Sequence, residues 1–200
     1  NGVPLARFSG GDRVAARAAL GLDETTLAIG TVAALRPEKN LRRMIDALHR
    51  MSADGAQLVI VGGGEEREGL EQHAAGLGLA GCVQFTGPMA EPEKVLAGLD
   101  IFALSSDTEQ MPVSVLEAMA MELPLASVDV GDVSEMVSEA NRELVAGHEA
   151  SDLAASLDRR AADPDLRARL GADNRAHVTA TFDERQMFAA YDRLFRGLAR

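Results

Sequence analysis

The chain has 200 residues and a formal net charge of -11 at pH 7, from 31 acidic and 20 basic residues. This acidic balance argues against nucleic acid as the main partner, because phosphate backbones are bound by clustered lysine and arginine. Hydrophobic residues make up 46% of the chain, which excludes general disorder, and a single cysteine, Cys82, excludes an internal disulfide.

Short apolar runs alternate with helical patterns along most of the chain after residue 25. No apolar run reaches the roughly 18 residues of a membrane span, and we expect a cytoplasmic protein. The predicted strands span residues 26–35, 57–64, 82–87, 101–106, 123–130 and 143–147. The predicted helices span 37–51, 65–79, 91–99, a stretch beginning at Pro112 or Val113, 132–140, and then 151–163, 164–182 and 183–200.

This alternation predicts one α/β domain with a Rossmann-like parallel sheet covered by helices on both faces, followed by a helical tail. Ligands of such sheets bind at the carboxyl ends of the strands. Three unusual loops follow predicted strands, at Ala33–Asn40, Gly62–Glu66 and Ser105–Pro112. The glycine run Gly62–Gly64 lacks the GxGxxG spacing of a dinucleotide site, so we interpret it as a tight turn from strand to helix.

Two glutamates, Glu109 and Glu117, flank the start of the helix predicted near Pro112. The first amides of that helix form an anion site without a basic residue. Glu117 lies within the helix and leans toward its N-terminus, while Glu109 precedes it. Carboxylates accept hydrogen bonds from hydroxyl pairs, so the pattern predicts an anion between two polyols, as in a nucleotide sugar. The alternative is that Glu109 is a solvated loop residue and Glu117 pairs with an arginine.

Two cations in the first loop are candidates for contact with a diphosphate. Lys39 follows the first predicted strand and can reach a phosphate as a point charge. Arg36 lies nearby and could take the same role. The alternative is that Lys39 is a solvated lysine at a helix start.

In their order, these motifs resemble the C-terminal, donor-binding domain of the group 1 (family 4) retaining glycosyltransferases, which have the GT-B fold. The matching segments are NGVPLARF, LRPEKN, LVIVGGGEEREGLE and VQFTG, followed by SxxxE, EAMA and LP. The resemblance covers nearly the whole chain. It implies transfer of a hexose-type sugar from a UDP-, GDP- or ADP-sugar, which is a substrate, and it implies no separate cofactor.

The resemblance also implies roles for individual residues. Lys39 would contact the donor diphosphate, Glu109 would contact the donor-sugar hydroxyls at the catalytic centre, and Glu117 would hold the ribose. The loop Gly87–Met89 would lie beside the base. The backbone touching sugar and phosphate would run through Gln110, Met111, Pro112, Val113 and Ser114.

The resemblance implies an organisation in which this domain works with another. Residues 1–25 would lead in from an N-terminal GT-B domain, 26–180 would bind the nucleotide sugar, and 181–200 would form a helix that packs toward that other domain. We therefore expect these 200 residues alone to be inactive in transfer. The acceptor, a sugar or lipid, is not indicated, and peripheral membrane contact would come through the other domain.

Several positions depart from the family pattern. Ala34 stands where an arginine is usual, Gln110 and Pro112 where glycine is frequent, and Glu122 where a glycine normally ends the helix. Without glycine, a left-handed helix cap costs about 1 kcal/mol. The loss of a cation at Ala34 favours a second hypothesis, a nucleotide-binding regulatory module without transfer activity. No histidine has a second ligand at metal spacing, so we predict no metal site.

Overall fold

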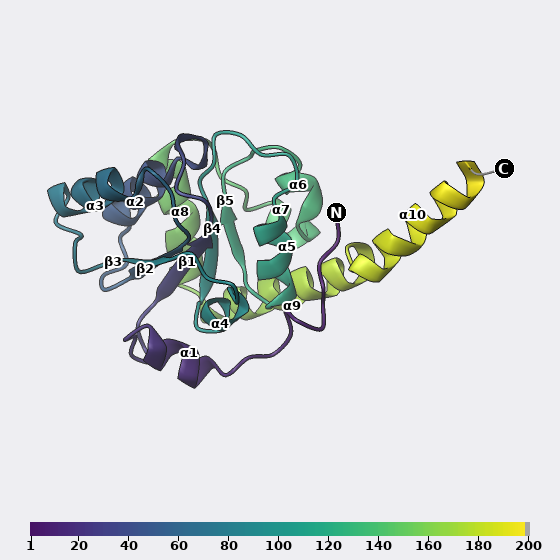
Figure 1. Cartoon of the computed structure of the whole chain (residues 1–200). Helices are drawn as coiled ribbons and strands as arrows, with labels where there is room; N and C mark the ends of the chain where they lie inside the picture. The colour runs from purple at the N-terminus through teal and green to yellow at the C-terminus, as the bar shows by residue number, and fades with distance from the viewer. Residues whose placement is uncertain (199–200) are drawn as a thin grey trace.

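The fold is built on a five-stranded, wholly parallel sheet, as seen in a computed structural model that describes residues 1–198 (Figure 1). The strand order is β3-β2-β1-β4-β5. The strands are β1 Ala28–Val32, β2 Gln57–Val61, β3 Val83–Gly87, β4 Ile101–Leu104 and β5 Leu125–Ser127. The order reverses direction between β1 and β4, which is the switch point where such sheets bind ligands. The predicted Rossmann-like fold is confirmed.

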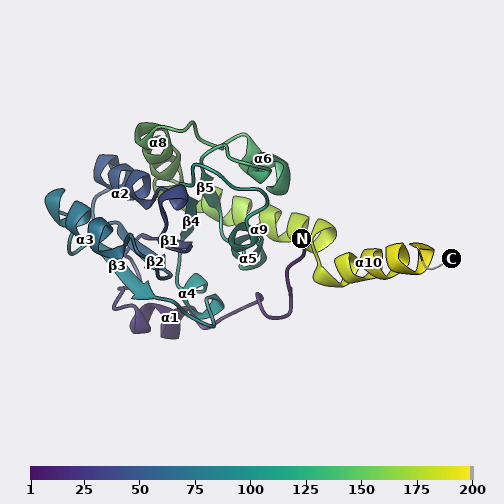
Figure 2. The ribbon, with the colours of Figure 1, turned by 45° about the horizontal axis from the view of Figure 1, so that its top comes forward.

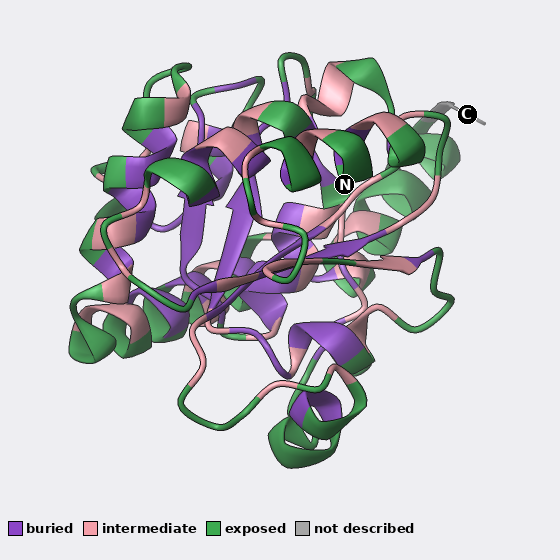
Figure 3. Ribbon diagram, turned by 90° about the vertical axis from the view of Figure 1, so that its left-hand side faces the viewer, coloured by how far each residue is buried: buried purple, intermediate pink, exposed green. Residues whose placement is uncertain are grey.

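Successive strand residues face opposite sides of the sheet, which divides the core into two clusters. On β2, Val59 and Val61 belong to one cluster while Leu58 and Ile60 belong to the other. The first cluster packs under α4 Glu93–Leu96, α5 Val113–Ala120 and part of α9 Pro164–Thr181. The second packs under α2 Leu41–Arg50, α3 Arg67–Gly76 and α8 Ala150–Ala161. Figure 3 shows the buried strands between helices whose outer faces are exposed.

Some predicted boundaries and elements differ from the structure. The strand predicted at 143–147 is wrong: only Ala146 pairs, in an isolated bridge to Val128. The helix predicted at 132–140 is two short helices, α6 Val133–Met136 and α7 Glu139–Arg142, because Val137 is extended, with φ -79° and ψ 160°. Residues 1–25 contain an unpredicted helix, α1 Arg13–Ala19, which begins at the cap residue Asp12.

The beginning and the end of the domain lie side by side. Val3 forms a parallel bridge with Asp183. The Val3 amide donates to the Phe182 carbonyl at 2.8 Å, and the Glu184 amide donates to the Val3 carbonyl at 3.1 Å. Beyond this bridge, α10 Glu184–Leu198 projects away from the sheet and its helices (Figure 2). Among residues 1–198, no helix has the length and apolarity to cross a membrane.

The end of α5 has the left-handed conformation that usually calls for glycine. Glu122 has φ 60°, and the helix α9 passes directly over it, where a Cβ on Gly171 would lie 2.0 Å from the Glu122 carbonyl oxygen. The positive φ disfavours any residue with a Cβ. The family departure at this position therefore coincides with a local strain.

We expect Glu122→Gly to raise the free energy of unfolding by about 1 kcal/mol, because glycine adopts positive φ without steric cost. Urea denaturation measures the change. The matched control is Glu68→Gly on the exposed side of α3, which should lower stability by about 1 kcal/mol because helical φ gives glycine no advantage. Equal losses in the two variants would contradict the assignment of strain to Glu122.

Candidate functional site

The loops that follow β1 and β2 are hydrogen bonded to each other at the carboxyl end of the sheet. The Leu35 amide donates to the Gly63 carbonyl at 3.0 Å, and the Glu66 amide donates to the Leu35 carbonyl at 3.2 Å. A Cβ on Gly62 would lie 1.8 Å from the Ala33 carbonyl oxygen, and one on Gly64 would lie 2.3 Å from the Leu35 carbonyl oxygen. The glycine run is thus a tight turn, as predicted, because only glycine allows the two backbones this close.

The two residues predicted to contact phosphate and sugar are paired with each other. Lys39, the last residue of the 3-10 turn Pro37–Lys39, places Nζ 2.7 Å from Oε1 of Glu109. The Ser106 hydroxyl donates to the same oxygen at 2.7 Å. The Glu109 side chain is 9% exposed and that of Lys39 is 23% exposed. Among the described residues nothing donates to Oε2 of Glu109, so that oxygen remains free to accept from a ligand.

A set of polar contacts fixes the loop after β1 against the loop after β4. Asn40, at φ 40°, donates through Nδ2 to both carboxylate oxygens of Asp107, at 2.9 and 3.1 Å. Arg43 contributes a third contact, from Nη2 to Asp107 Oδ1 at 2.6 Å, and a fourth to the Ser105 carbonyl at 2.8 Å. The hydrogen bond from Asn40, together with that from Arg43, lowers the pKa of Asp107 against the opposing effect of burial. These contacts hold Lys39 and Glu109 at their observed spacing.

The helix α5 begins at Val113, and Pro112 precedes it in an extended conformation. No side chain of the described residues caps this N-terminus, so its first amides are available to an anion. Ser114 is half-buried and Val113 is 44% exposed. Glu117 is also half-buried, one turn further along the helix.

Burial raises the pKa of Glu117, Arg7 lowers it, and Glu93 raises it further. The alternative in which Glu117 pairs with an arginine is not seen among the described residues. Arg7, the cation that acts on Glu117, forms its ion pair with Glu93 at 2.9 Å. Glu117 therefore remains a half-buried acceptor near the helix start.

A hollow of about 390 Å³ opens over the carboxyl ends of β1, β2 and β3. Met89, 41% exposed, and Pro88 form its wall on the β3 side. Ala34 is exposed and lines it as well. Its other lining residues are Val32, Ala33, Val61, Gly62 and Gly63.

The other residues predicted for the site lie at the edge of this region or outside it. Gln110 is exposed, and its carbonyl accepts from the Asp132 amide at 2.8 Å. The Met111 carbonyl accepts from Asn1 at 3.1 Å. Arg36 is exposed and lines a separate hollow of about 230 Å³ with Arg42, Glu66 and Asp107. The structure thus brings Lys39, Glu109, Glu117 and the start of α5 to the switch point, but directs Arg36 toward α2.

Three residues of the candidate site were not predicted from the sequence. Asn40 and Asp107 position the two loops, and Ser106 orients Glu109. A signal was present, since Asn40 ends the RPEKN run and Ser106 and Asp107 follow a buried strand at the edge where ligands bind. Polar residues in the loops after two strands that flank a switch point favour contact between those loops.

Chemically, this arrangement suits a ligand with an anionic centre and hydroxyls on both sides. The free amides of α5 and the Lys39 ammonium favour negative charge. Glu109 and Glu117 can each accept hydrogen bonds from hydroxyls. Within residues 1–198, no three His, Cys, Asp or Glu side chains gather in a way that could hold a metal ion.

Comparison with known proteins identifies the family. Residues 12–177 match the model of glycosyl transferases group 1. The chain is 31% identical to a D-inositol 3-phosphate glycosyltransferase of Stackebrandtia nassauensis, over 95% of this chain and 47% of that protein. It is 32% identical to a GDP-mannose-dependent phosphatidylinositol monomannoside mannosyltransferase of Corynebacterium glutamicum, over 90% of this chain and 50% of that protein.

Among solved structures, Anabaena HepE in complex with UDP superposes with a TM-score of 0.89 at 21% identity, over 98% of this chain and 56% of that one. The same protein has also been solved with UDP-glucose, with a TM-score of 0.88 at 23% identity. At these identities the likeness shows the fold. The chain spans about half the length of the curated relatives it matches. From the family match and the identity to these relatives, the chain belongs to the group 1 glycosyltransferases.

Proposed function

We propose that this chain is the donor-binding domain of a retaining glycosyltransferase that transfers a hexose-type sugar from a nucleoside diphosphate to an acceptor. The observation that carries the proposal is the meeting of Lys39, Glu109 and the uncapped start of α5 at the switch point of the sheet. A diphosphate beside the α5 amides would have Glu109 on one side and Glu117 on the other. That layout matches sugar, diphosphate and ribose.

In this proposal each residue has a defined part. Lys39 neutralises the diphosphate, and the backbone from Gln110 to Ser114 follows the sugar and phosphate. Glu109 accepts from the sugar hydroxyls through Oε2, while Lys39 and Ser106 hold Oε1. Glu117 accepts from the ribose, and the base lies against Pro88 and Met89 in the 390 Å³ hollow.

The donor classes to test come from the proteins that this chain resembles. UDP and UDP-glucose are bound by the Anabaena protein, and GDP-mannose is named for the Corynebacterium relative. The hollow is lined mainly by apolar side chains and backbone, which suits a base stacked on its face. A UDP-, GDP- or ADP-sugar is therefore the donor class to test.

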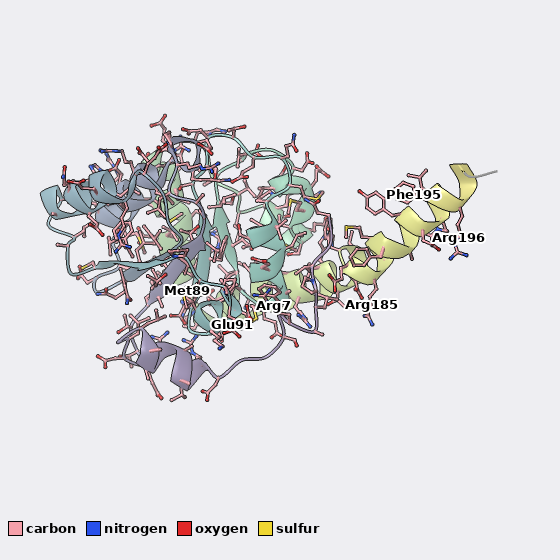
Figure 4. All side chains as sticks on the ribbon, viewed as in Figure 1. Arg7, Met89, Glu91, Arg185, Phe195 and Arg196 are labelled. Atoms are coloured by element: carbon pink, nitrogen blue, oxygen red, sulfur yellow. The ribbon has the colours of Figure 1, made fainter. Side chains whose placement is uncertain are left out.

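We infer that α10 provides the contact with an N-terminal GT-B domain. Its exposed apolar side chains cluster on the projecting helix, where Figure 4 labels Phe195. Phe195 is 64% exposed, and Tyr191 stacks on it with ring centroids 6.3 Å apart. Exposed apolar patches of this kind mark interaction sites. The exposed apolar residues of this helix are Phe188, Tyr191, Leu194 and Phe195.

A second function has one specific observation in its favour. Ala34 lines the hollow, so the cation usual at this position of the family is absent from the donor site. A nucleotide-binding regulatory module without transfer activity would tolerate that loss. Assay of the chain joined to its N-terminal domain, with nucleotide sugar and a panel of sugar and lipid acceptors, separates transfer from binding.

The two glutamates are expected to respond differently to the parts of the donor. Glu117→Ala should weaken both the nucleoside diphosphate and the nucleotide sugar, while Glu109→Ala should weaken only the sugar-bearing ligand. A lost hydrogen bond to a charged group costs roughly 1.5–3 kcal/mol, or about 10- to 150-fold in affinity. Calorimetric titration with UDP-, GDP- and ADP-sugars and the parent diphosphates measures the split.

The Glu109→Ala variant has a second expected result, which concerns its affinity for the bare diphosphate. Removing Glu109 frees the ammonium of Lys39, so the affinity for the bare diphosphate should stay level or rise. If the wild-type chain binds one of these donors and neither variant has a lower affinity for it, the assignment of the two carboxylates is wrong.

A further inference from the structure

Arg7 connects the N-terminal segment to the loop that follows β3. Its Nη2 donates to the Ala90 carbonyl at 2.6 Å and to Oε2 of Glu93 at 2.9 Å. Ala90 follows Met89 directly, and Glu93 begins α4. In Figure 4, Arg7 lies with Met89 and Glu91 beside α4 and α5. One side chain thus fixes the segment Ala90–Glu93, which directly follows Met89.

The Arg7 guanidinium packs on the ring of the neighbouring Phe8. Its guanidinium carbon lies 5.2 Å from the centroid of the Phe8 ring, and Phe8 is buried, with 1% exposure. A cation over an aromatic face is held in place electrostatically. Nε and Nη1 of Arg7 donate to no residue that the structure describes, so two of its donor groups remain available.

Arg7 also acts on the carboxylate of Glu117. The charged groups that act on Glu117 are Arg7, from the N-terminal segment, and Glu93, from α4, and their effects oppose each other. Burial raises the pKa of Glu117, and Arg7 is the cation that lowers it. Without Arg7, burial and the like charge of Glu93 would both act to raise the pKa of Glu117.

We propose that Arg7 is a positioning residue for the nucleoside end of the donor, holding the Pro88–Ala90 segment in place against the base and keeping Glu117 available to the ribose. This inference rests on the proposed function. It adds a residue from the N-terminal segment, outside the loops at the strand ends, to the determinants of nucleoside affinity.

The chain contains a matched control for this residue. Arg13 also ties the N-terminal region to the domain, through Leu99 and an ion pair with Asp100 at 2.6 Å. The Arg13 side chain is 45% exposed and its carboxylate partner 14%, against 44% and 19% for Arg7 and Glu93. Arg13 therefore has the same type of contact and exposure, but its hydrogen bonds go to Leu99 and Asp100 instead of Ala90 and Glu93.

The experiment compares wild type, Arg7→Ala, Arg7→Lys and Arg13→Ala in calorimetric titrations with UDP, GDP, ADP and pyrophosphate between pH 5 and pH 8. Arg7→Ala should weaken the nucleoside diphosphate that binds by roughly tenfold. Its affinity for pyrophosphate, which has no nucleoside, should stay at the wild-type value. Arg13→Ala should match wild type with every ligand, and thermal unfolding checks that each variant is folded.

The pH profile separates positioning from a purely structural role. A nucleoside diphosphate that needs the Glu117 carboxylate loses affinity as pH falls through the pKa of Glu117. Loss of Arg7 raises that pKa, so the decline in Arg7→Ala should begin at a higher pH than in wild type. Arg7→Lys should restore the profile, since its charge is retained, but only part of the affinity, since lysine lacks the planar guanidinium. The phosphate groups of the ligand also change protonation with pH, but this change is the same for every variant and does not contribute to a difference between them.

The outcomes distinguish this inference from the function on which it rests. Wild type that binds no nucleoside diphosphate would overturn both. Binding by wild type with an unchanged Arg7→Ala, or with equal losses for pyrophosphate and nucleoside diphosphate, would overturn the role of Arg7 alone. An unshifted pH profile in Arg7→Ala would remove the link to Glu117.

Discussion

Gly171→Ala is expected to lower the free energy of unfolding by about 3 kcal/mol or more, the upper range for overpacking a core. The added methyl group would lie 2.0 Å from the Glu122 carbonyl oxygen and 2.9 Å from its carbonyl carbon. Both atoms belong to the backbone, so no side chain can rotate away. Relief requires α9 to move off the end of α5, which would disturb the first core cluster.

Gly76→Ala provides the matched control, because Gly76 lies at the end of α3 with nothing within 4 Å of an added Cβ. Alanine is the better helix former, so this variant should be as stable as wild type or up to about 1 kcal/mol more stable. Denaturation of both variants in urea gives the comparison. A loss of less than about 1 kcal/mol in Gly171→Ala would show that α9 accommodates the methyl group and does not rest closely on Glu122.

Lys39→Ala is expected to cause the largest loss of diphosphate affinity among single substitutions in the loops. Ala34 supplies no cation and Arg36 lines a separate hollow, so of the candidate cations in the loop after β1 it is Lys39 that lies beside Glu109 at the switch point. A charge-assisted contact contributes roughly 1.5–3 kcal/mol, which predicts a loss of about 10- to 150-fold. Titration with nucleoside diphosphate and nucleoside monophosphate measures it, and the monophosphate should lose less.

The control for this prediction is Arg36→Ala, which should leave diphosphate affinity near wild type. Ala34→Arg gives the opposite sign, since it would restore a cation facing the hollow, and should strengthen binding by about 1 kcal/mol or more. A larger loss from Arg36→Ala than from Lys39→Ala would show that Arg36 turns toward the ligand and carries the charge instead.

The fold was predictable because its signals are local. Each central strand is a short apolar run, and helices with a buried stripe separate the strands. The boundaries were less accurate. The predicted strand 26–35 shortens to Ala28–Val32 because the following residues turn to bond the loop after β2. The error at 143–147 has a similar cause, since Glu143 and Leu144 form a turn, Val145 packs against the first core cluster and only Ala146 pairs.

The candidate site was located from the sequence at positions where one residue type has few other uses. A glutamate inside an apolar helix and a lysine after a strand each indicate a ligand contact without reference to any other residue. Their mutual contact was not predictable, because it depends on how the Asn40 and Asp107 side chains bring two distant loops together. The tilt of Arg36 away from the hollow likewise depends on the extended backbone, φ -126° and ψ 157°, before the 3-10 turn. The role of Arg7 depends on contacts across more than 80 residues.

The bridge between Val3 and Asp183 has a practical consequence for engineering. The chain enters and leaves the sheet domain through two adjacent, hydrogen-bonded segments, packed so closely that a Cβ on Gly2 would lie 2.6 Å from the Glu184 Cα. A module whose ends emerge together can be inserted into a surface loop of a host protein without stretching either partner. Residues 3–183 therefore form a unit that can be transferred as an insert from one host protein to another.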